Sequence, residues 1–465
     1  MNETCKACIL RKNLDRYPAG SPEEAVREYR DRVRAIAEQG DPASTGPEAA
    51  LELSQLRREM FGEKSRDFTE IKRHYNALML RLEETLERQI LAASDPLERA
   101  VQYAMAGNYI DFAALENVEE GKLLELLEQA SRIAVSRTCL ESLRSRITAA
   151  ETLTYFTDNC GEIVADKLLI RQLQALRPGL EVTVVLRGET DGNDATVEDA
   201  EQVGLTELGA CMGNGTVLDG SVLRIMPRQV REHADADVVI AKGQANYETL
   251  HGCARNVFYI FLCKCELYMQ RFDMPQFTGV LTEEDPEMLL REFADRALSE
   301  RFRFRPIRRE EAVQTGEMEK ICFPPREACS MESMVQRVER IPEQFLVAED
   351  RETGRLAGFI NGLASEETQF RDAFFTDASL HDPAAQTVYL LGLEVLPQYR
   401  GLGLAEELMR LYTIWEQVKG RTRLVLTCHT QLADMYRRFG FRDIGRSGSS
   451  WGGETWQEME FSVGG

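Results

Sequence analysis

The first part of the chain carries apolar side chains with the spacing of amphipathic helices. Between residues 22 and 106 they recur every three or four positions, a period that places them along one face of a helix. The first such series is Val26, Tyr29, Val33 and Ile36. Asp95-Pro96-Leu97-Glu98 has the composition of a helix start, and the helix it opens should end near Gly107. The pattern predicts a helical part over about residues 1–150.

From about residue 151 the pattern changes to short apolar runs, each followed by a glycine-containing turn and a helical stretch. This succession is typical of parallel βα units. The predicted strands are 153–157, 182–186, 238–241 and 257–262. We therefore expect a Rossmann-like parallel sheet over residues 151–285, which together with the helical part makes a first domain of residues 1–285.

A charged amphipathic stretch without an obvious core follows, and we interpret residues 286–302 as a linker helix. A second mixed α/β pattern then predicts a separate domain over residues 303–465. Its candidate strands are 344–348, 356–362, 388–395, 423–428 and 458–463, with a long helix at 404–419. The fold class is therefore α/β in both domains, and the length of 465 residues suits two or three domains rather than one core.

Composition excludes several classes of function. The 56 Lys and Arg against 77 Asp and Glu give a net charge of −21, which repels phosphate backbones and disfavours nucleic-acid partners. The longest apolar run, residues 257–263, is far shorter than the roughly 20 residues that span a bilayer. The charged N-terminus has no apolar signal region. We expect a cytoplasmic protein without a membrane partner, whose 11 cysteines are reduced.

A glycine-rich turn follows the predicted strand 388–395 and precedes the long helix. Gly401 and Gly403 have no side chains, so successive backbone amides can point at an anion beside the positive end of the helix dipole. A diphosphate fits this arrangement. The alternative is a tight turn that merely contains glycines.

The segment Gln398-x-x-Gly401-x-Gly403 resembles the acetyl-CoA motif of the GNAT N-acetyltransferases, and residues 424–428 and 435–441 resemble later elements of that fold. Residues 322–328 and 436–441 are most similar to the arylalkylamine N-acetyltransferases. The resemblance implies a GNAT domain that transfers an acetyl group from acetyl-CoA to an amine. The implied cofactor-binding residues are Leu393, Val395, Gln398, Arg400, Gly401, Leu402, Gly403 and Ala405.

Acetyl transfer needs a base for the amine and an acid for the departing thiolate. Tyr436 matches the conserved tyrosine of the family and is the candidate acid; the alternative is a core aromatic residue. The two histidines of the arylalkylamine enzymes are replaced by Tyr389 and Leu391. Glu394 or His429 is the candidate base in their place, or each is a solvated surface residue. The missing histidines also support a different interpretation, a GNAT domain that binds acyl-CoA without turnover and regulates its partner domain.

Polar side chains follow the strands of the first domain where each one ends. They include Asp158, Asn159, Asp194 and Lys242. Because ligands of open parallel sheets bind beyond the carboxyl ends of the strands, we expect these side chains to converge. Carboxylate and amide oxygens suit Mg²⁺ or Mn²⁺, and a lysine adds the positive charge that a phosphate ester requires. The alternative is that these residues only cap the helices that follow.

Residues 157–166, 193–194, 241–248 and 262–265 resemble the damage-control phosphatases, also known as domain of unknown function 89. The resemblance implies a divalent metal, Mg, Mn, Co or Ni, held by Asp158, Asn159 and Asp194, with Asp158 as the catalytic residue. It also implies hydrolysis of sugar phosphates or damaged phosphometabolites. The residues expected to bind substrate or phosphate are Asn108, Asp111, Glu162, Arg187, Lys242 and Asn246.

The two resemblances together predict a bifunctional enzyme, a metal-dependent phosphatase fused to an acetyltransferase. A carboxyl methyltransferase is a lower-ranked alternative for the first domain, which lacks an evident glycine-rich methyl-donor loop. Cys5-x-x-Cys8 also matches the phosphatase family, but a single pair cannot complete a tetrahedral zinc site. We expect these two thiols to serve packing.

Overall fold

The computed structural model describes residues 3–39, 44–64, 66–115, 118–188 and 192–462. The chain forms two compact units. Unit 1 comprises Met1–Leu250 and Arg255–Glu284, and unit 2 comprises His251–Ala254 and Asp285–Gly465. The predicted strand 458–463 reaches Val463, which lies outside the described residues.

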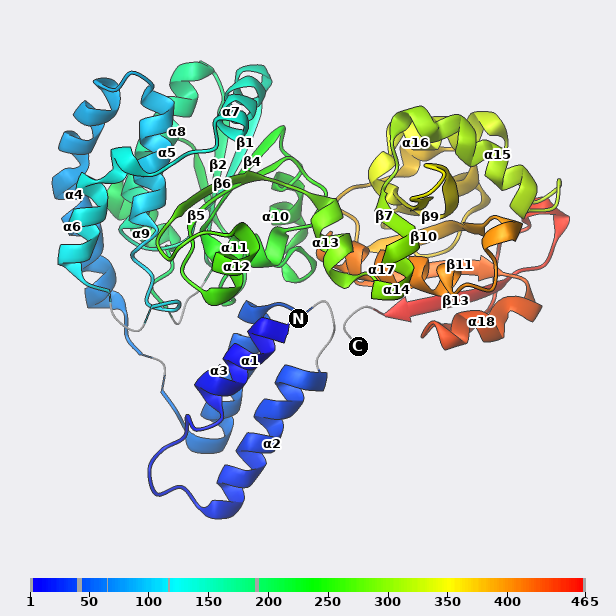
Figure 1. The fold of residues 1–465 in the computed structure, drawn as a ribbon, viewed down its shortest axis with the longest axis horizontal. Coiled ribbons are helices and arrows are strands. Elements are labelled where there is room, and N and C mark those ends of the chain that lie inside the picture. The colour runs from blue at the N-terminus through cyan, green and yellow to red at the C-terminus, as the bar shows by residue number, and fades with distance from the viewer. Residues whose placement is uncertain (1–2, 40–43, 65, 116–117, 189–191, 463–465) are drawn as a thin grey trace. The chain divides into compact units, whose positions relative to one another are not determined.

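Unit 1 begins with the predicted helices. They are α1 (Glu3–Asn13), α2 (Glu23–Gln39), α3 (Gly46–Phe61), α4 (Thr69–Leu91), α5 (Pro96–Gly107), α6 (Glu120–Glu128) and α7 (Arg137–Ala149). Helix α5 has the predicted bounds because Asp95 caps it, its side chain accepting the Glu98 amide at 3.2 Å. Helices α2 and α3 lie side by side and share with α1 a small core of their own around Tyr29 and Leu53 (Figure 1).

The sheet of unit 1 has the strand order β3-β2-β1-β4-β5-β6. The strands are β1 (Thr152–Phe156), β2 (Glu181–Leu186), β3 (Ala210–Gly213), β4 (Val238–Lys242), β5 (Val257–Leu262) and β6 (Gly279–Glu283). All neighbours are parallel except β5 and β6, so the predicted parallel sheet is confirmed with one antiparallel edge strand. Its helices are α8 (Glu162–Leu176), α9 (Val197–Val203), α10 (Arg228–His233), α11 (Gly243–Leu250) and α12 (Glu266–Phe272).

Unit 2 contains a second sheet in the order β12-β13-β11-β10-β9-β8-β7. The strands are β7 (Phe302–Pro306), β8 (Phe345–Asp350), β9 (Leu356–Ala364), β10 (Thr387–Val395), β11 (Arg423–Cys428), β12 (Arg442–Arg446) and β13 (Gln457–Ser462). The helices are α13 (Pro286–Phe293), α14 (Arg296–Arg301), α15 (Ala312–Cys322), α16 (Met331–Arg340), α17 (Leu404–Val418) and α18 (Ala433–Arg438). The stretch expected to be a linker helix thus forms α13 and α14, which belong to unit 2.

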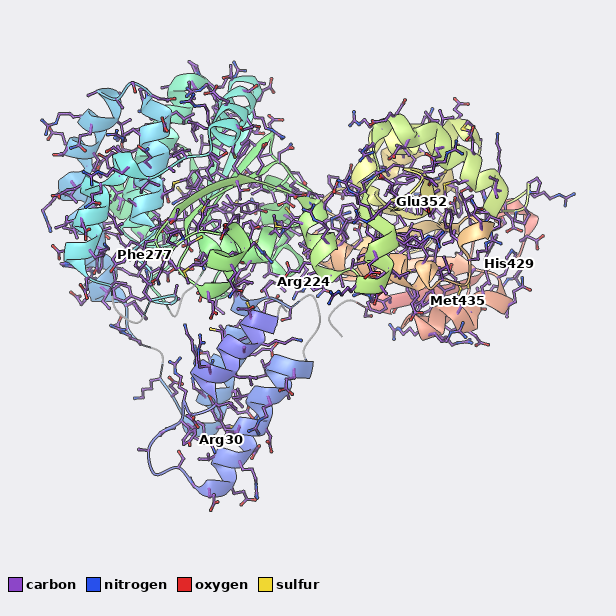
Figure 2. The ribbon with its side chains drawn as sticks, viewed as in Figure 1. Arg30, Arg224, Phe277, Glu352, His429 and Met435 are labelled. Carbon is purple, nitrogen blue, oxygen red and sulfur yellow. The ribbon has the colours of Figure 1, made fainter. Side chains whose placement is uncertain are left out.

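The central strands of unit 2 separate where its cavity lies. β10 and β11 are the parallel pair of the sheet, and their pairing ends at Leu390 opposite Leu426. A bulge in β10 between Leu390 and Gly392 follows directly. Figure 2 labels His429 and Met435, which come after β11 and line this cavity.

Two further expectations concern membranes and thiols. None of the helices among the described residues combines the length and the apolar character that crossing a bilayer requires. No disulfide is formed among the 11 cysteines, all of which lie in the part of the chain that the structure describes.

Candidate functional site

The turn after β1 and the loop after β2 meet at the carboxyl edge of the sheet in unit 1. β1 ends at Phe156, and Asp158 and Asn159 lie in the turn before α8. The loop after β2 returns to this turn, because Asn159 and Asp194 form an antiparallel bridge. The Ala195 amide also donates to the Asp158 carbonyl at 2.8 Å. The expected convergence of strand ends is therefore present in the fold.

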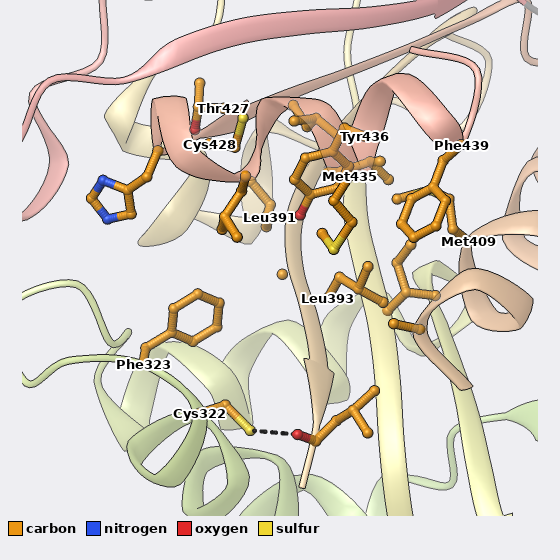
Figure 3. Close-up of a pocket in the computed structure, with 18 of the residues that line it drawn as sticks. Cys322, Phe323, Leu391, Leu393, Met409, Thr427, Cys428, Met435, Tyr436 and Phe439 are labelled. Atoms are coloured by element: carbon orange, nitrogen blue, oxygen red, sulfur yellow. Dashed lines mark hydrogen bonds between the residues drawn. The ribbon is translucent and has the colours of Figure 1, made fainter. Parts of the chain in front are cut away.

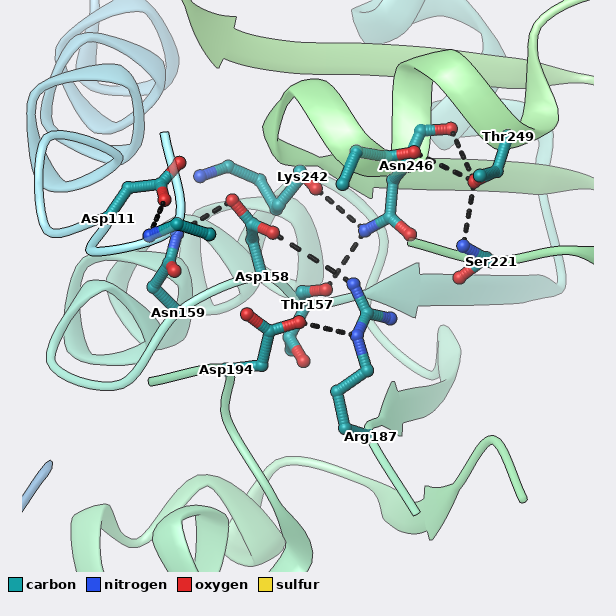
Figure 4. A network of polar contacts seen from close by, with 12 residues as sticks. Asp111, Thr157, Asp158, Asn159, Arg187, Asp194, Ser221, Lys242, Asn246 and Thr249 are labelled. Carbon is teal, nitrogen blue, oxygen red and sulfur yellow. Dashed lines mark hydrogen bonds and ion pairs between the residues drawn. The ribbon is translucent and has the colours of Figure 1, made fainter. Parts of the chain in front are cut away.

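The three residues expected to hold a metal lie together in one buried network (Figure 4). Asp158 Oδ2 accepts hydrogen bonds from Asn159 Nδ2 at 2.7 Å and from Asn108 Nδ2 at 2.8 Å. Asp194 Oδ2 accepts one from Arg187 Nε at 2.6 Å. The other end of the Arg187 guanidinium, Nη2, lies 3.9 Å from Asp158 Oδ1. Arg187 thus bridges the two carboxylates.

The network has more negative charge than its cations neutralise. Burial, and then the charges of Glu162 and Asp194, raise the pKa of Asp158 well above its ordinary value. Burial also raises the pKa of Asp194, although Arg187 opposes this effect. Two buried polar atoms beside the carboxylates, Arg187 Nη2 and Asn246 Oδ1, have no hydrogen-bond partner among the described residues. The centre therefore suits a cation together with a polar ligand.

Lys242 lies next to this network and forms ion pairs with residues of α8. It is fully buried, donates to the Ala104 carbonyl at 2.8 Å and pairs with Glu162 and Asp166 of α8. Burial lowers the pKa of Lys242, but the charges of Asp166 and Glu162 outweigh it and raise that pKa to about 12. The structure therefore places Lys242 as the counter-ion of α8, and a direct contact with phosphate would require these pairs to open.

Lys264 is a second lysine at the same edge of the sheet, just after β5. Its Nζ lies 2.6 Å from Asp111 Oδ2, and it is 4% exposed. Burial raises the pKa of Asp111, but the charge of Lys264 together with the hydrogen bonds from Lys264 and the Ala114 and Ala113 amides lowers it below its ordinary value. Asn108 is also anchored here, its Oδ1 accepting the Leu262 amide at 3.0 Å. Sequence reasoning assigned no role to Lys264, although its place after a buried strand was a usable signal.

Gly243 is the other residue whose role sequence reasoning missed. It has a φ of +82°, and a Cβ built on it would lie 1.9 Å from Asp158 Oδ2. Only glycine leaves room for that carboxylate and adopts this backbone conformation without strain. Asn193 contributes as well, since its Nδ2 donates to Asn159 Oδ1 at 2.9 Å and so orients that amide. A glycine directly after a strand end was the signal available in the sequence.

The donor set is of mixed type. In the part of the chain that the structure describes, no three His, Cys, Asp or Glu side chains are grouped as a metal site. Asp158, Asn159 and Asp194 instead offer two carboxylates and an amide, hard oxygen donors of the kind that Mg²⁺ and Mn²⁺ prefer. Cys5 and Cys8 lie half-buried on α1.

Unit 2 contains a cavity of about 980 Å³ where β10 and β11 separate (Figure 3). The expected cofactor-binding residues that line it are Leu393, Val395, Arg400, Gly401, Gly403 and Ala405. Gln398 and Leu402 are exposed and lie outside the lining. Gly401 and Gly403 have φ values of +77° and +83°, and α17 begins at Leu404, which lines the cavity, so the helix begins beside the cavity with its N-terminal amides.

Tyr436 and His429 both line this cavity, whereas Glu394 does not. The Tyr436 side chain extends toward the strand that carries Leu391 and Leu393 (Figure 3), and burial raises the pKa of its phenol. His429 Nε2 lies 3.0 Å from Glu327 Oε2. Glu394 is fully buried.

Neither position that corresponds to the missing histidine pair offers a titratable side chain that lines the cavity. Tyr389 is buried, its ring packs against Phe374 with centroids 4.7 Å apart, and its hydroxyl donates to the Glu367 carbonyl. It is therefore part of the core. Leu391 lines the cavity but has no titratable group.

Comparisons with known proteins identify the family of each unit. The family model of the damage-control phosphatase ARMT1-like domain matches residues 1–278, and that of the GNAT acetyltransferase family matches residues 312–441. Damage-control phosphatases generally depend on a divalent metal, and GNAT proteins bind acetyl-CoA.

Individual relatives are archaeal. A damage-control phosphatase of Pyrococcus horikoshii is 34% identical over 184 residues, 38% of this chain and 62% of that relative's length. Another, from Archaeoglobus fulgidus, is 24% identical over 273 residues, 56% of this chain and 91% of that relative. A crystal structure from Pyrococcus horikoshii, of a protein in the family called domain of unknown function 89, has 24% identity and a TM-score of 0.48, covering 61% of this chain and 99% of that one. The chain belongs to the damage-control phosphatase family with the ARMT1-like domain, and its C-terminal unit is a GNAT acetyltransferase domain.

Proposed function

We propose that unit 1 is a divalent-metal-dependent phosphatase that hydrolyses a phosphomonoester of a small metabolite, such as a sugar phosphate. The observation that carries this proposal is the convergence of Asp158, Asn159 and Asp194 in one buried network with excess negative charge. A divalent cation held by their three oxygens would supply the missing positive charge. The donor set therefore fits the metal on which the family depends.

The residues around this centre would contact different groups of a bound phosphate ester. A bound metal would polarise the phosphoryl oxygens and lower the pKa of a water molecule. Arg187 Nη2, which has no hydrogen-bond partner among the described residues, would donate to a phosphoryl oxygen, and Lys264 adds a second positive charge. Asn246 Oδ1, likewise unpartnered there, would accept a hydrogen bond from a substrate hydroxyl. Gly243 keeps the space that the Asp158 carboxylate occupies.

The test is hydrolysis of p-nitrophenyl phosphate by the full chain with Mn²⁺, Co²⁺, Ni²⁺ or Mg²⁺, and without metal. We expect metal-dependent release of nitrophenol, and a loss of kcat/KM of about 100-fold or more in Asp158→Asn and in Asp194→Asn. Glu128→Gln, which changes an exposed carboxylate of α6, is the matched control and should retain full activity. Activity that persists in both aspartate variants would remove the proposed site.

A specific observation favours a second activity in unit 2, acetyl transfer from acetyl-CoA to an amine. Tyr436 lines the same cavity as the glycine turn before α17, and its side chain extends toward the strand that carries Leu391 and Leu393 (Figure 3). Its raised pKa keeps the phenol protonated, so it can donate a proton to the departing thiolate. His429, paired with Glu327, lines the same cavity and is the candidate base.

Release of free thiol from acetyl-CoA in the presence of a panel of primary amines tests this activity. We expect Tyr436→Phe to lower kcat by about 100-fold with the KM for acetyl-CoA unchanged. Tyr412→Phe removes a buried hydroxyl of α17 that donates to the Gln344 carbonyl and lies outside the cavity, so it controls for packing. Tight CoA binding without turnover on any amine would instead support the regulatory acyl-CoA-binding role.

A further inference from the structure

Asn76, on α4, is a fully buried amide in the helical part of unit 1. Neither the sequence pattern nor the chemistry described above assigns it a role. α4 packs against α8 and α9, the helices that follow the two converging turns of the phosphatase centre. Along the chain Asn76 is 85 residues from Gly161 and 123 from Asp199, yet its side chain contacts both of them. The amide therefore joins three distant segments beside the centre.

The oxygen of this amide holds the turn that carries the first two predicted metal ligands. Asn76 Oδ1 accepts the Gly161 amide at 2.6 Å. Gly161 has a φ of +69°, and a Cβ built on it would lie 3.0 Å from Tyr75 Cβ, so α4 packs closely against the turn. Glu162 follows directly and accepts the Asn159 amide at 3.3 Å and Asn159 Nδ2 at 3.0 Å. Fixing Gly161 thus helps to fix the orientation of Asn159.

The nitrogen of the same amide holds the loop that carries the third predicted ligand. Asn76 Nδ2 donates to Asp199 Oδ1 and to Gln202 Oε1, both at 2.9 Å. Asp199 Oδ2 in turn accepts the amide and the hydroxyl of Thr196, also at 2.9 Å each. Thr196 is two residues after Asp194 in the chain. Asn76 is therefore connected to Asp194 through one carboxylate and a short piece of backbone.

An amide side chain suits this position because it accepts and donates at once. A leucine of similar size offers neither function, and an aspartate could accept from Gly161 but could not donate to Asp199. The two turns need such a support, because the carboxylates of Asp158 and Asp194 repel each other when no cation lies between them. Asn76 supplies a link that does not depend on the metal.

We propose that Asn76 is a positioning residue of the phosphatase centre, which holds the turns of Asp158 and Asp194 in the arrangement that binds a divalent cation. The inference rests on the proposed phosphatase function, because the cation is the one on which that function depends. Asn76 acts through the Gly161 backbone and the Asp199 carboxylate. Its loss should weaken metal binding and leave the contacts of the substrate unchanged.

Binding of Mn²⁺ to the full chain, measured from the electron paramagnetic resonance signal of the free ion, tests this role without substrate. We expect Asn76→Leu to weaken Mn²⁺ binding by about 10- to 100-fold. Gln102→Leu is the matched control, since Gln102 is a buried amide of α5 that accepts from Arg99 and donates to the Ile133 carbonyl, both within the helical part. It should lower the Tm by a similar amount and leave Mn²⁺ affinity unchanged.

A second set of variants keeps the test independent of whether Asn76→Leu folds. Asn76→Asp places a second carboxylate against Asp199, so it should also weaken Mn²⁺ binding. Adding Asp199→Asn restores one donor and one acceptor with their positions exchanged. The double variant should regain Mn²⁺ affinity to within about threefold of wild type. A double variant that binds Mn²⁺ as weakly as Asn76→Asp would contradict the link between the turns.

Hydrolysis of p-nitrophenyl phosphate separates metal positioning from a contact with substrate. In Asn76→Leu the Mn²⁺ concentration for half-maximal activity should rise by about 10- to 100-fold. The KM for the ester at saturating Mn²⁺ should stay as in wild type. A higher KM at an unchanged requirement for Mn²⁺ would place Asn76 at the substrate and overturn the positioning role.

The remaining outcomes distinguish this role from the proposed function itself. If wild type binds Mn²⁺, Asp158→Asn loses it and Asn76→Leu binds it as wild type does, the positioning role is wrong and the metal centre stands. Equal weakening in Asn76→Leu and Gln102→Leu would show a general folding defect and also overturns the role. If Asp158→Asn binds Mn²⁺ as wild type does, the proposed centre fails and the role with it. Weakened Mn²⁺ binding in Asn76→Leu, without hydrolysis by wild type, would uphold the role and refute the phosphatase activity.

Discussion

At the scale of single residues, the phosphatase centre depends on a position that has no side chain. Other carboxylates surround Asp158. Asn108 and Asn159 hold its Oδ2 by hydrogen bonds, and Gly243 leaves room for the carboxylate because it has no side chain. The aspartates themselves could be found from the sequence, because their types and their places after strands indicate their chemistry. Gly243 could be noticed only as a glycine directly after a strand end, because the reason that it must be glycine is the Asp158 carboxylate that folds against it.

Gly243→Ala isolates this requirement. Its Cβ would overlap the Asp158 carboxylate, so the side chain of Asp158 must leave its place. We expect metal-dependent hydrolysis of p-nitrophenyl phosphate to fall by about 100-fold and the free energy of unfolding by about 1–3 kcal/mol. Gly179→Ala is the matched control, since Gly179 has a similar φ of +88° with no atom within 4 Å. It should lose about 1 kcal/mol of stability and retain activity; an equal loss of activity in both variants would contradict the steric explanation.

The same limit applies to Glu394 and Lys242. The sequence identifies both as candidate functional residues. Their surroundings depend on neighbours that are distant in the chain: Glu319 for Glu394, and Glu162 and Asp166 for Lys242. A lysine expected to meet phosphate is therefore found in an ion pair next to the site. Sequence patterns indicate which side chains carry chemistry, and the packing decides which of them meet a ligand.

At the scale of elements, the sequence predicts central strands well and edge strands poorly. β1, β4 and β5 are almost wholly buried, and most of their residues are apolar, with a continuous apolar run in β5 and in the first four residues of β4. β3 (Ala-Cys-Met-Gly) and β12 (Arg-Asp-Ile-Gly-Arg) lie at the edges of their sheets and have no such run. An edge strand is specified largely by the hydrogen bonds of its one neighbour, which composition does not record. The helix bounds of α5 were predicted because capping is a local interaction.

At the scale of the whole molecule, the chain joins two units that each have a core and a candidate site. The core of unit 1 surrounds its parallel sheet, and unit 2 has cores on its own sheet. The phosphatase residues come from unit 1 alone, and the residues that line the cavity come from unit 2 alone. A ligand of one site should therefore stabilise mainly the unit that binds it.

Calorimetric unfolding of the full chain tests this independence. A ligand at about 100 times its Kd adds about 2.7 kcal/mol to the stability of the unit that binds it. We expect Mn²⁺ to raise the Tm of one transition and CoA to raise the Tm of another. Asp158→Asn should abolish the shift caused by Mn²⁺, because it removes a carboxylate of the proposed metal centre in unit 1. It should preserve the shift caused by CoA, because the cavity lies in unit 2. A single transition that both ligands shift equally would contradict this independence, because it would show that the two units unfold together as one cooperative body with two binding sites.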